Sequence, residues 1–288
     1  MSANPNLTKI EDLNEMARQI RRDIINMLTI SQTGHSGGPL GMADIFTALY
    51  FNKLKLDDTK PEMNDRDYLF VSIGHIAPVW YATLARRGYF SIDELKTLRK
   101  INGRLQGHPA PAHTHGVPGV EITSGSLGQG LSIAVGTALG LRMNGKDNYV
   151  YCINGDGELN EGQIWEAMMT AAHHKVDNLT MIIDRNFCQI DNRTENVMNL
   201  EPLADKFKAF GWEVFEIDGH NMQEILDTFD KAKAFKGKPK VIIAKTFMGR
   251  GVSFMEDNYK WHGVPPNKEQ SEIALKELAV TKFGDFVN

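Results

Sequence analysis

The sequence contains little cysteine, no long apolar run and no surplus of positive charge. Two cysteines, Cys152 and Cys188, cannot form a disulfide framework in 288 residues. The most apolar stretch, residues 131–141, is interrupted by serine, glycine and threonine and is too short to span a bilayer. The formal net charge of −4 argues against a nucleic-acid-binding protein, which usually carries a basic surplus. We therefore expect partners other than nucleic acids and membranes.

The chain also lacks an apolar leader near its start, so we expect no signal peptide and a cytoplasmic protein. No GxGxxG turn lies between a first strand and a helix, which disfavours a nicotinamide dehydrogenase. The length suits one large domain or two small ones. Because no repeat, low-complexity tract or linker divides the sequence, we expect a single domain over residues 1–288.

Apolar runs of strand length alternate with segments of helical period along most of the chain. This alternation predicts an α/β fold, a doubly wound and mostly parallel sheet with helices on both faces. A glycine-rich turn over residues 33–39 and a loop over 103–130 interrupt the pattern, and long loops of this kind often carry function. The expected strands are 67–72, 149–153, 179–183, 213–217 and 240–245, and the expected helices are 7–30, 42–51, 77–87, 131–142, 202–210 and 222–234.

The most informative stretch is residues 154–186, which reads as strand end, acidic glycine turn, helix and second strand. Asp156 follows the first strand and Asn186 follows the second, so both fall at the edge where parallel strands end. A carboxylate and an amide oxygen suit Mg²⁺ or Ca²⁺ rather than zinc. Gly155 and Gly157 allow the backbone to approach a diphosphate at the start of the helix. The pattern predicts a divalent metal held between protein oxygens and a diphosphate, although Gly-Asp-Gly alone is an ordinary turn.

Four histidines lie next to glycine in turns: His35, His75, His108 and His262. Any one of them by itself is more typical of a surface or packed position. A buried cluster would differ, because neutral imidazole can donate, accept and titrate near pH 7. His75 follows a predicted strand and shares the sheet edge with Asp156, and the loops that carry His35 and His108 could converge there.

The spacing from Gly-Asp-Gly to the later Asn resembles the thiamine diphosphate signature. Further segments resemble transketolases in the right order over about residues 10–270: TGHSGGPLGMAD, VSIGHIAPVWYA, LQGHP, VEITSGSLGQGLSIAVG and WHGVPP. The resemblance implies the diphosphate-binding domain of a thiamine diphosphate-binding fold. It also implies thiamine diphosphate and Mg²⁺ (or Ca²⁺) as cofactors, with the metal bound by Asp156, Asn186 and the carbonyl of Cys188.

The resemblance further implies the roles of individual residues. His35, His75, His108 and His262 would contact substrate hydroxyls and assist proton transfers, and Glu161 would join a hydrogen-bonded link between two cofactor sites. The implied catalytic residues are thus His35, His75, His108, His262 and Glu161. The implied cofactor-binding residues are His75, Gly125, Ser126, Leu127, Gly155, Asp156, Gly157, Glu161, Asn186, Ile190 and His262.

Some positions depart from the family pattern or allow more than one role. Ser126 stands where many members have proline. Glu166, which we expect on one helical face with Glu161, could join the same link or simply favour the helix dipole. His113 and His115 lie outside the shared motifs and could be a weak metal site, a specificity insert or an exposed pair in a loop.

The segments that resemble transketolase leave out two parts of that enzyme. The glutamate that activates the cofactor ring and the arginines that bind the sugar phosphate belong to a second domain. The resemblance therefore implies a C-terminal transketolase subunit with the pyrimidine-binding domain as partner, in an α2β2 assembly. Together they would transfer a two-carbon ketol unit from a ketose phosphate to an aldose phosphate.

Three alternatives remain at this point. The chain could serve a transketolase-like enzyme for an unusual ketose, branched or sulfonated. It could be the α subunit of a 2-oxo acid dehydrogenase, which shares the Gly-Asp-Gly…Asn signature but is disfavoured by GHSGGPLGMAD and SLGQG. It could also be a cofactor-binding subunit that has lost catalysis, against which the four histidines argue.

Overall fold

Five parallel strands form one sheet in the order β1-β2-β3-β5-β4. The computed structural model describes residues 6–287. Residues 1–5, which belong to the segment where no signal peptide is expected, and residue 288 lie outside the described part. The predicted doubly wound parallel fold is confirmed. The strands are β1 Tyr68–Val71, β2 Val150–Gly155, β3 Leu179–Arg185, β4 Glu213–Asp218 and β5 Lys240–Lys245.

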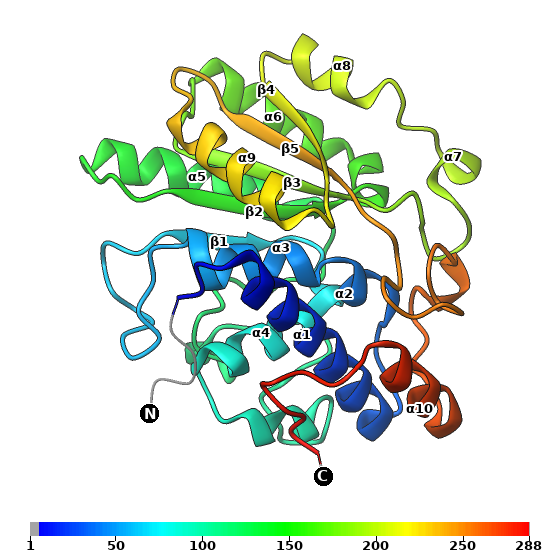
Figure 1. Ribbon diagram of the computed structural model, residues 1–288. Helices are drawn as coiled ribbons and strands as arrows, with labels where there is room; N and C mark the ends of the chain where they lie inside the picture. The colour runs from blue at the N-terminus through cyan, green and yellow to red at the C-terminus, as the bar shows by residue number, and fades with distance from the viewer. Residues whose placement is uncertain (1–5, 288) are drawn as a thin grey trace.

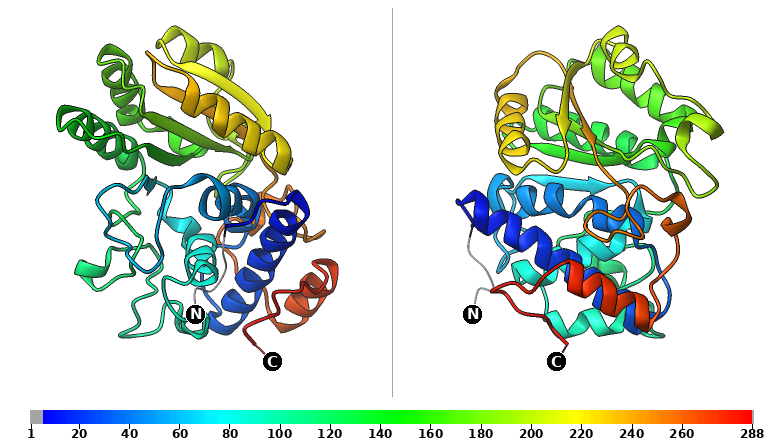
Figure 2. Two further views of the ribbon diagram at one scale, coloured as in Figure 1. Left: turned by 60° about the vertical axis from the view of Figure 1, so that its left-hand side comes forward. Right: turned by 45° about the vertical axis from the view of Figure 1, so that its right-hand side comes forward.

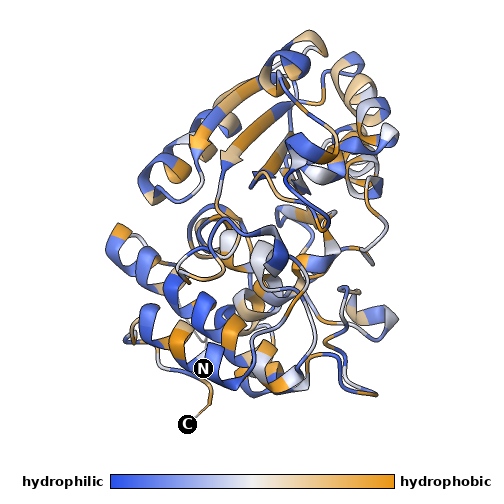
Figure 3. Cartoon of the chain, turned by 90° about the vertical axis from the view of Figure 1, so that its right-hand side faces the viewer, coloured by the Kyte–Doolittle hydropathy of each residue, from blue (hydrophilic) through white to orange (hydrophobic). Residues whose placement is uncertain are grey.

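Helices cover both faces of the sheet (Figure 1; Figure 2). Cys152 and Met181 pack with α5, α6 and α8 on one face, whereas Tyr151 and Ile182 pack with α9 and the α1–α4 region on the other. Successive residues of a strand point to opposite faces, so the apolar runs of β2 and β3 are buried on both sides. Figure 3 shows strands of the sheet as mostly hydrophobic. The helices are α1 Ile10–Ser31, α2 Gly37–Gly41, α3 Ala43–Ala48, α4 Ala77–Arg87, α5 Gln129–Met143, α6 Gly162–His173, α7 Thr194–Val197, α8 Leu203–Ala209, α9 Met222–Ala234 and α10 Lys268–Glu277.

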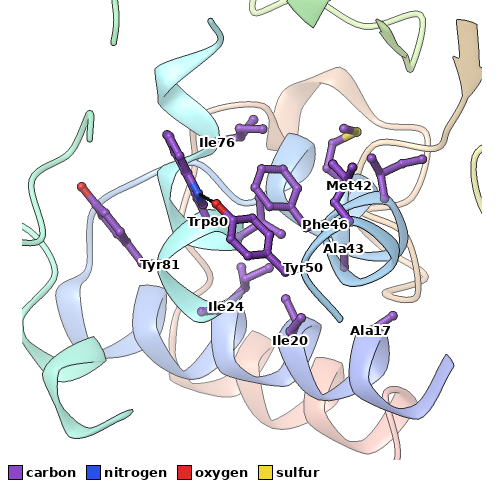
Figure 4. Packing of buried hydrophobic residues seen from close by; sticks show 14 of the residues in the cluster. Ala17, Ile20, Ile24, Met42, Ala43, Phe46, Tyr50, Ile76, Trp80 and Tyr81 are labelled. Atoms are coloured by element: carbon purple, nitrogen blue, oxygen red, sulfur yellow. Dashed lines mark hydrogen bonds between the residues drawn. The ribbon is translucent and has the colours of Figure 1, made fainter. Parts of the chain in front are cut away.

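Helices α1, α3 and α4 pack together beyond the β1 edge of the sheet (Figure 1). At their centre Trp80 donates its indole N–H to the hydroxyl of Tyr50 at 2.6 Å, with Ile20, Ile24 and Phe46 close by (Figure 4). All five side chains are buried. This packing fixes the two loops that follow α1 and β1, each of which carries a histidine of the site described below.

Two local predictions need correction. The helix expected over residues 42–51 is α3 followed by a π-helical turn, Leu49–Lys53. The glycine-rich turn expected over 33–39 is already helical from Gly37, where α2 begins. Gly37 has no room for a side chain, because a Cβ there would lie 2.3 Å from the Cγ of Met248. Close packing against a distant loop therefore decides the local structure.

Within residues 6–287, no helix has the length and apolarity needed to cross a membrane.

Candidate active site

A cavity of about 370 Å³ lies at the carboxyl ends of β2 and β3. Parallel strands bring their ends to one edge, and the register aligns Gly155 of β2 with Asp184 of β3. Nearly all of the predicted site residues line this cavity, and only Ser126 and Glu161 among them do not. The predicted residues that line it are His35, His75, His108, Gly125, Leu127, Gly155, Asp156, Gly157, Asn186, Cys188, Ile190 and His262.

Three of the histidines form a compact cluster. The ring centroids of His35 and His75 are 5.1 Å apart, those of His75 and His262 also 5.1 Å, and those of His35 and His262 5.6 Å. They come from the loop after α1, the 3-10 turn after β1 and the segment before α10. His108 lies at the side of Gly125, where a Cβ would approach its ring within 3.1 Å. The predicted convergence of the segments that carry His35, His75 and His108 is therefore present, and the segment that carries His262 joins them.

Burial keeps these histidines uncharged at neutral pH. It lowers the pKa of His75 to about 3 and that of His35 to about 4, with further lowering by the neighbouring His262. Arg99, whose guanidinium donates to the Thr33 hydroxyl at 3.1 Å, adds to the lowering of the pKa at His35. The Nδ1 atoms of His35 and His262 are buried without a hydrogen-bond partner among the described residues. Buried polar atoms normally have partners, so these two nitrogens favour a polar ligand in the cavity.

Asp156 is held by three hydrogen bonds. Its carboxylate accepts from the backbone N–H of Gly157 at 2.7 Å, from that of Phe187 at 2.6 Å and from Arg185 at 3.0 Å. Burial, followed by repulsion from Asp184, raises the pKa of Asp156 to about 7. A bound cation would stabilise the charged form of such a carboxylate.

Asn186 lies beside Asp156 and is held by two hydrogen bonds. Its amide N–H donates to Asp184 at 2.8 Å, and its amide oxygen accepts from the backbone N–H of Cys188 at 2.9 Å. Within residues 6–287, no group of three or more His, Cys, Asp or Glu side chains could hold a metal. The predicted metal ligands, one carboxylate, one amide and one backbone carbonyl, include only one such side chain, Asp156.

The glycines around the cavity are closely packed and leave no free space for a side chain. A Cβ on Gly157 would lie 2.8 Å from the Cγ of Gln189, and one on Gly155 would lie 3.1 Å from Ile73. Gly125 has φ +135°, a conformation that side chains rarely adopt. The lining thus fits a metal–diphosphate group, with Ile190 and Leu127 as partly exposed apolar contacts.

The prediction that Glu161 and Glu166 lie on one face of the same helix is wrong. Helix α6 begins at Gly162, and Glu161 precedes it with an extended backbone at φ −73° and ψ 125°. Both carboxylates are exposed, and the Glu161 side chain makes no capping hydrogen bond.

His113 and His115 are also exposed, which favours an exposed pair in a loop among the three possibilities for these residues.

Sequence reasoning missed the residues that hold the predicted ones in place. Asp184 orients Asn186 and is itself bonded by Thr246. Arg185 pairs with Asp156, and Glu158 accepts four hydrogen bonds beneath the acidic turn. The available signal was the presence of charged residues at the end of a buried strand and directly after the Gly-Asp-Gly turn, since charges are rarely buried without partners.

Comparison with known proteins agrees with this geometry. The family described as transketolase, thiamine diphosphate binding domain, matches residues 13–284. The chain belongs to this family. It is a transketolase-type transferase subunit, and not the α subunit of a 2-oxo acid dehydrogenase.

Two relatives of this transketolase chain are themselves subunits of similar length. The 6-deoxy-6-sulfo-D-fructose transketolase subunit of Clostridium sp. (strain MSTE9) is 42% identical over 93% of this chain and 96% of its own. An apulose-4-phosphate transketolase subunit of Phocaeicola vulgatus is 39% identical over 94% and 95%. The crystal structure of transketolase from Campylobacter jejuni superposes with a TM-score of 0.88 at 34% identity, over 95% of this chain. This chain spans 44% of that one, less than half of its length.

Proposed function

We propose that this chain is the thiamine diphosphate-binding subunit of a two-subunit transketolase that moves a two-carbon ketol unit from a ketose to an aldose. The observation that carries the proposal is the single cavity in which the neutral histidine cluster faces Asp156 and Asn186. Relatives that are named as subunits and match over nearly their whole length support the two-subunit arrangement.

The cofactor would lie with its diphosphate at the acidic glycine turn. Asp156, Asn186 and the carbonyl of Cys188 would hold Mg²⁺ (or Ca²⁺) against it. When bound, thiamine diphosphate supplies the electron sink that makes carbon–carbon cleavage and transfer possible. The protein residues add position and electrostatics. The residues that we propose bind the cofactor are those implied by the resemblance: His75, Gly125, Ser126, Leu127, Gly155, Asp156, Gly157, Glu161, Asn186, Ile190 and His262.

The histidines would handle substrate protons. Because His35 and His75 have lowered pKa values, each is neutral at pH 7 and can accept a hydrogen bond from a sugar hydroxyl. The Nδ1 atoms of His35 and His262, which are buried and have no partner among the described residues, are two further polar atoms of the histidine cluster. His108, with a lowered pKa from partial burial, would serve the same purpose near Gly125. Together they would orient the carbonyl and its neighbouring hydroxyls for proton transfer.

The partner would complete the site. Thiamine enzymes need a carboxylate against the ring of the cofactor. The carboxylates that line the cavity in the described residues, Asp156, Glu158 and Asp184, all have hydrogen-bond partners already. The activating glutamate would therefore come from a C-terminal transketolase subunit that carries the pyrimidine-binding domain, in an α2β2 assembly.

For the donor substrate we propose an unusual ketose of the kinds named for the two relatives, a sulfo sugar or apulose 4-phosphate. The names of the two relatives include a sulfo sugar and a sugar phosphate. The ordinary pentose phosphates are the second candidate, because they would use the same histidines.

The test combines the purified chain with the chain of the same genome that matches the rest of transketolase. Ketol transfer is measured with xylulose 5-phosphate, apulose 4-phosphate and 6-deoxy-6-sulfofructose as donors. We expect turnover of at least one donor by the mixture, dependent on thiamine diphosphate, and negligible turnover by either chain alone. Robust transfer by this chain alone would contradict the two-subunit proposal. Absence of cofactor binding by the mixture would contradict the whole assignment.

A further inference from the structure

Glu158 occupies a buried position directly beneath the acidic glycine turn. It lies in the 3-10 helix Gly157–Asn160 and is only 2% exposed. One carboxylate oxygen, Oε1, accepts from the hydroxyl of Ser72 and from the backbone N–H of Gly128 at 2.8 Å. The other, Oε2, accepts from the side-chain amide of Asn154 at 2.9 Å and from the backbone N–H of Gly155 at 3.1 Å. A carboxylate has about four lone-pair sites, so its capacity is filled.

These four donors come from three separate segments. Ser72 follows β1, Gly128 ends the loop that carries Gly125 and Leu127, and Asn154 and Gly155 end β2. Gly125 and Gly155 both line the cavity, so one buried carboxylate ties together two of its walls. The Ser72 hydroxyl also accepts from the backbone N–H of Gly130 at 3.1 Å, which extends the network.

We propose that Glu158 is a positioning residue for the cofactor: it holds the 125–128 loop at a fixed separation from the acidic glycine turn. This inference rests on the proposed function, since it concerns the same cavity. Hydrogen bonds to a charged acceptor are stronger than neutral ones. A buried carboxylate bound to two backbone N–H groups therefore fixes the orientation of both peptide groups. The residue acts through these walls and not through contact with the reacting atoms.

Substitution of Glu158 by glutamine tests the role of the charge with little change in shape. Glutamine offers one acceptor oxygen and one NH₂ group. The Ser72 hydroxyl can reverse and accept from that NH₂. Asn154 can also reverse, because its Oδ1 has no partner among the described residues. The backbone N–H groups of Gly128 and Gly155 cannot reverse. Whichever way the glutamine points, one of these buried donors loses its acceptor, and its peptide group is free to rotate.

The experiment uses this chain assembled with its partner subunit. The dissociation constant of thiamine diphosphate in the presence of Mg²⁺ is measured by calorimetry for wild type, Glu158→Gln and Ser72→Ala, each corrected for the folded fraction. We expect Glu158→Gln to weaken binding about 10-fold or more, a factor that corresponds to the loss of one buried hydrogen bond. Ser72→Ala removes one of the four donors and also the acceptor of the Gly130 N–H, so it should weaken binding as well. Glu272→Gln, an exposed position on α10, is the matched control and should bind like wild type.

The outcomes separate this inference from the proposed function. If wild type binds the cofactor and Glu158→Gln binds it equally well, the positioning role is wrong. A purely structural role would lower the unfolding midpoint but leave the affinity of the folded fraction unchanged, which also overturns it. If Glu158→Gln does not fold, Ser72→Ala decides, and unchanged affinity in that variant contradicts the inference. If wild type itself binds no thiamine diphosphate, the proposed function fails instead.

Discussion

Replacement of Asp156 by asparagine should remove the metal site while changing the free energy of unfolding by less than about 3 kcal/mol. Burial and Asp184 raise the pKa of Asp156 from 3.8 to about 7 in the folded chain. A raised carboxyl pKa means that the charge costs stability. This cost is absent below pH 3.8, where the carboxyl group is protonated in both the folded and the unfolded chain. Stability is therefore highest there and falls as the pH rises through 7. At about 1.36 kcal/mol per unit, the shift gives an upper limit of about 4 kcal/mol for this cost above pH 7.

Asparagine would remove that cost but would lose one acceptor. Its oxygen can keep the bonds from Arg185 and from the N–H of Phe187, both of which go to the same carboxylate oxygen. Its NH₂ then faces the N–H of Gly157, which loses its acceptor, and an unsatisfied donor costs about 1 to 3 kcal/mol. Gly157 is only partly buried, so the cost falls near the lower end. The two terms oppose each other, and the free energy of unfolding without cofactor should change by less than about 3 kcal/mol.

Metal-dependent binding should respond far more strongly than stability. Loss of a supporting residue around a metal typically weakens affinity by about 10- to 100-fold, so loss of a direct ligand should reach at least about 100-fold. Urea unfolding of the chain at pH 8 gives the first quantity, and calorimetry of the assembled enzyme with Mg²⁺ and thiamine diphosphate gives the second. Asp205→Asn, on the exposed face of α8, is the matched control and should change neither. Retention of Mg²⁺-dependent cofactor affinity by Asp156→Asn would refute the metal assignment.

Two further predictions concern the cavity walls. Because the pKa values of His35 and His75 are lowered to about 4 and about 3, their contribution to stability should be full above pH 6.5 and be lost as the pH falls towards 4. In urea unfolding between pH 7 and 5, His75→Asn should reduce the pH slope by up to about 1.36 kcal/mol per pH unit, and an unchanged slope would contradict this. Gly74→Ala should impair cofactor binding, since its Cβ would lie 2.7 Å and 2.8 Å from atoms of the 124–125 loop. Gly136→Ala, with nothing within 4 Å in α5, should instead stabilise the isolated chain by about 0.5 to 1 kcal/mol; equal effects of the two changes would refute the steric reasoning.

The strand and helix pattern of the chain was largely predictable because local signals agree with the tertiary fold. The limits expected for α4, α9 and β5 match the observed ones, since each combines a clear period with end signals. The end predicted for the helix over residues 42–51 was wrong. There the chain continues as a π-helical turn whose first three residues are buried, so an amphipathic period gives no boundary.

The candidate site was predictable in its residues but not in its supports. Asp156 and Asn186 follow from two strand ends, and the four histidines follow from the resemblance to transketolases. Glu158 and Asp184 were missed because a single acid in the sequence does not reveal which distant donors will reach it. The donors Ser72 and Gly128 reach Glu158, and Thr246 reaches Asp184, from segments far away along the chain.

The sequence by itself determined the alternation of strands and helices, the acidic glycine turn and the family to which the motifs belong, because these depend on residue types at short spacing. The tertiary structure alone decided that three histidine rings from distant segments lie within 5.6 Å of one another. It also decided that burial keeps His35 and His75 neutral and raises the pKa of Asp156. Desolvation and long-range hydrogen bonds depend on how the whole chain packs, and no local pattern specifies them.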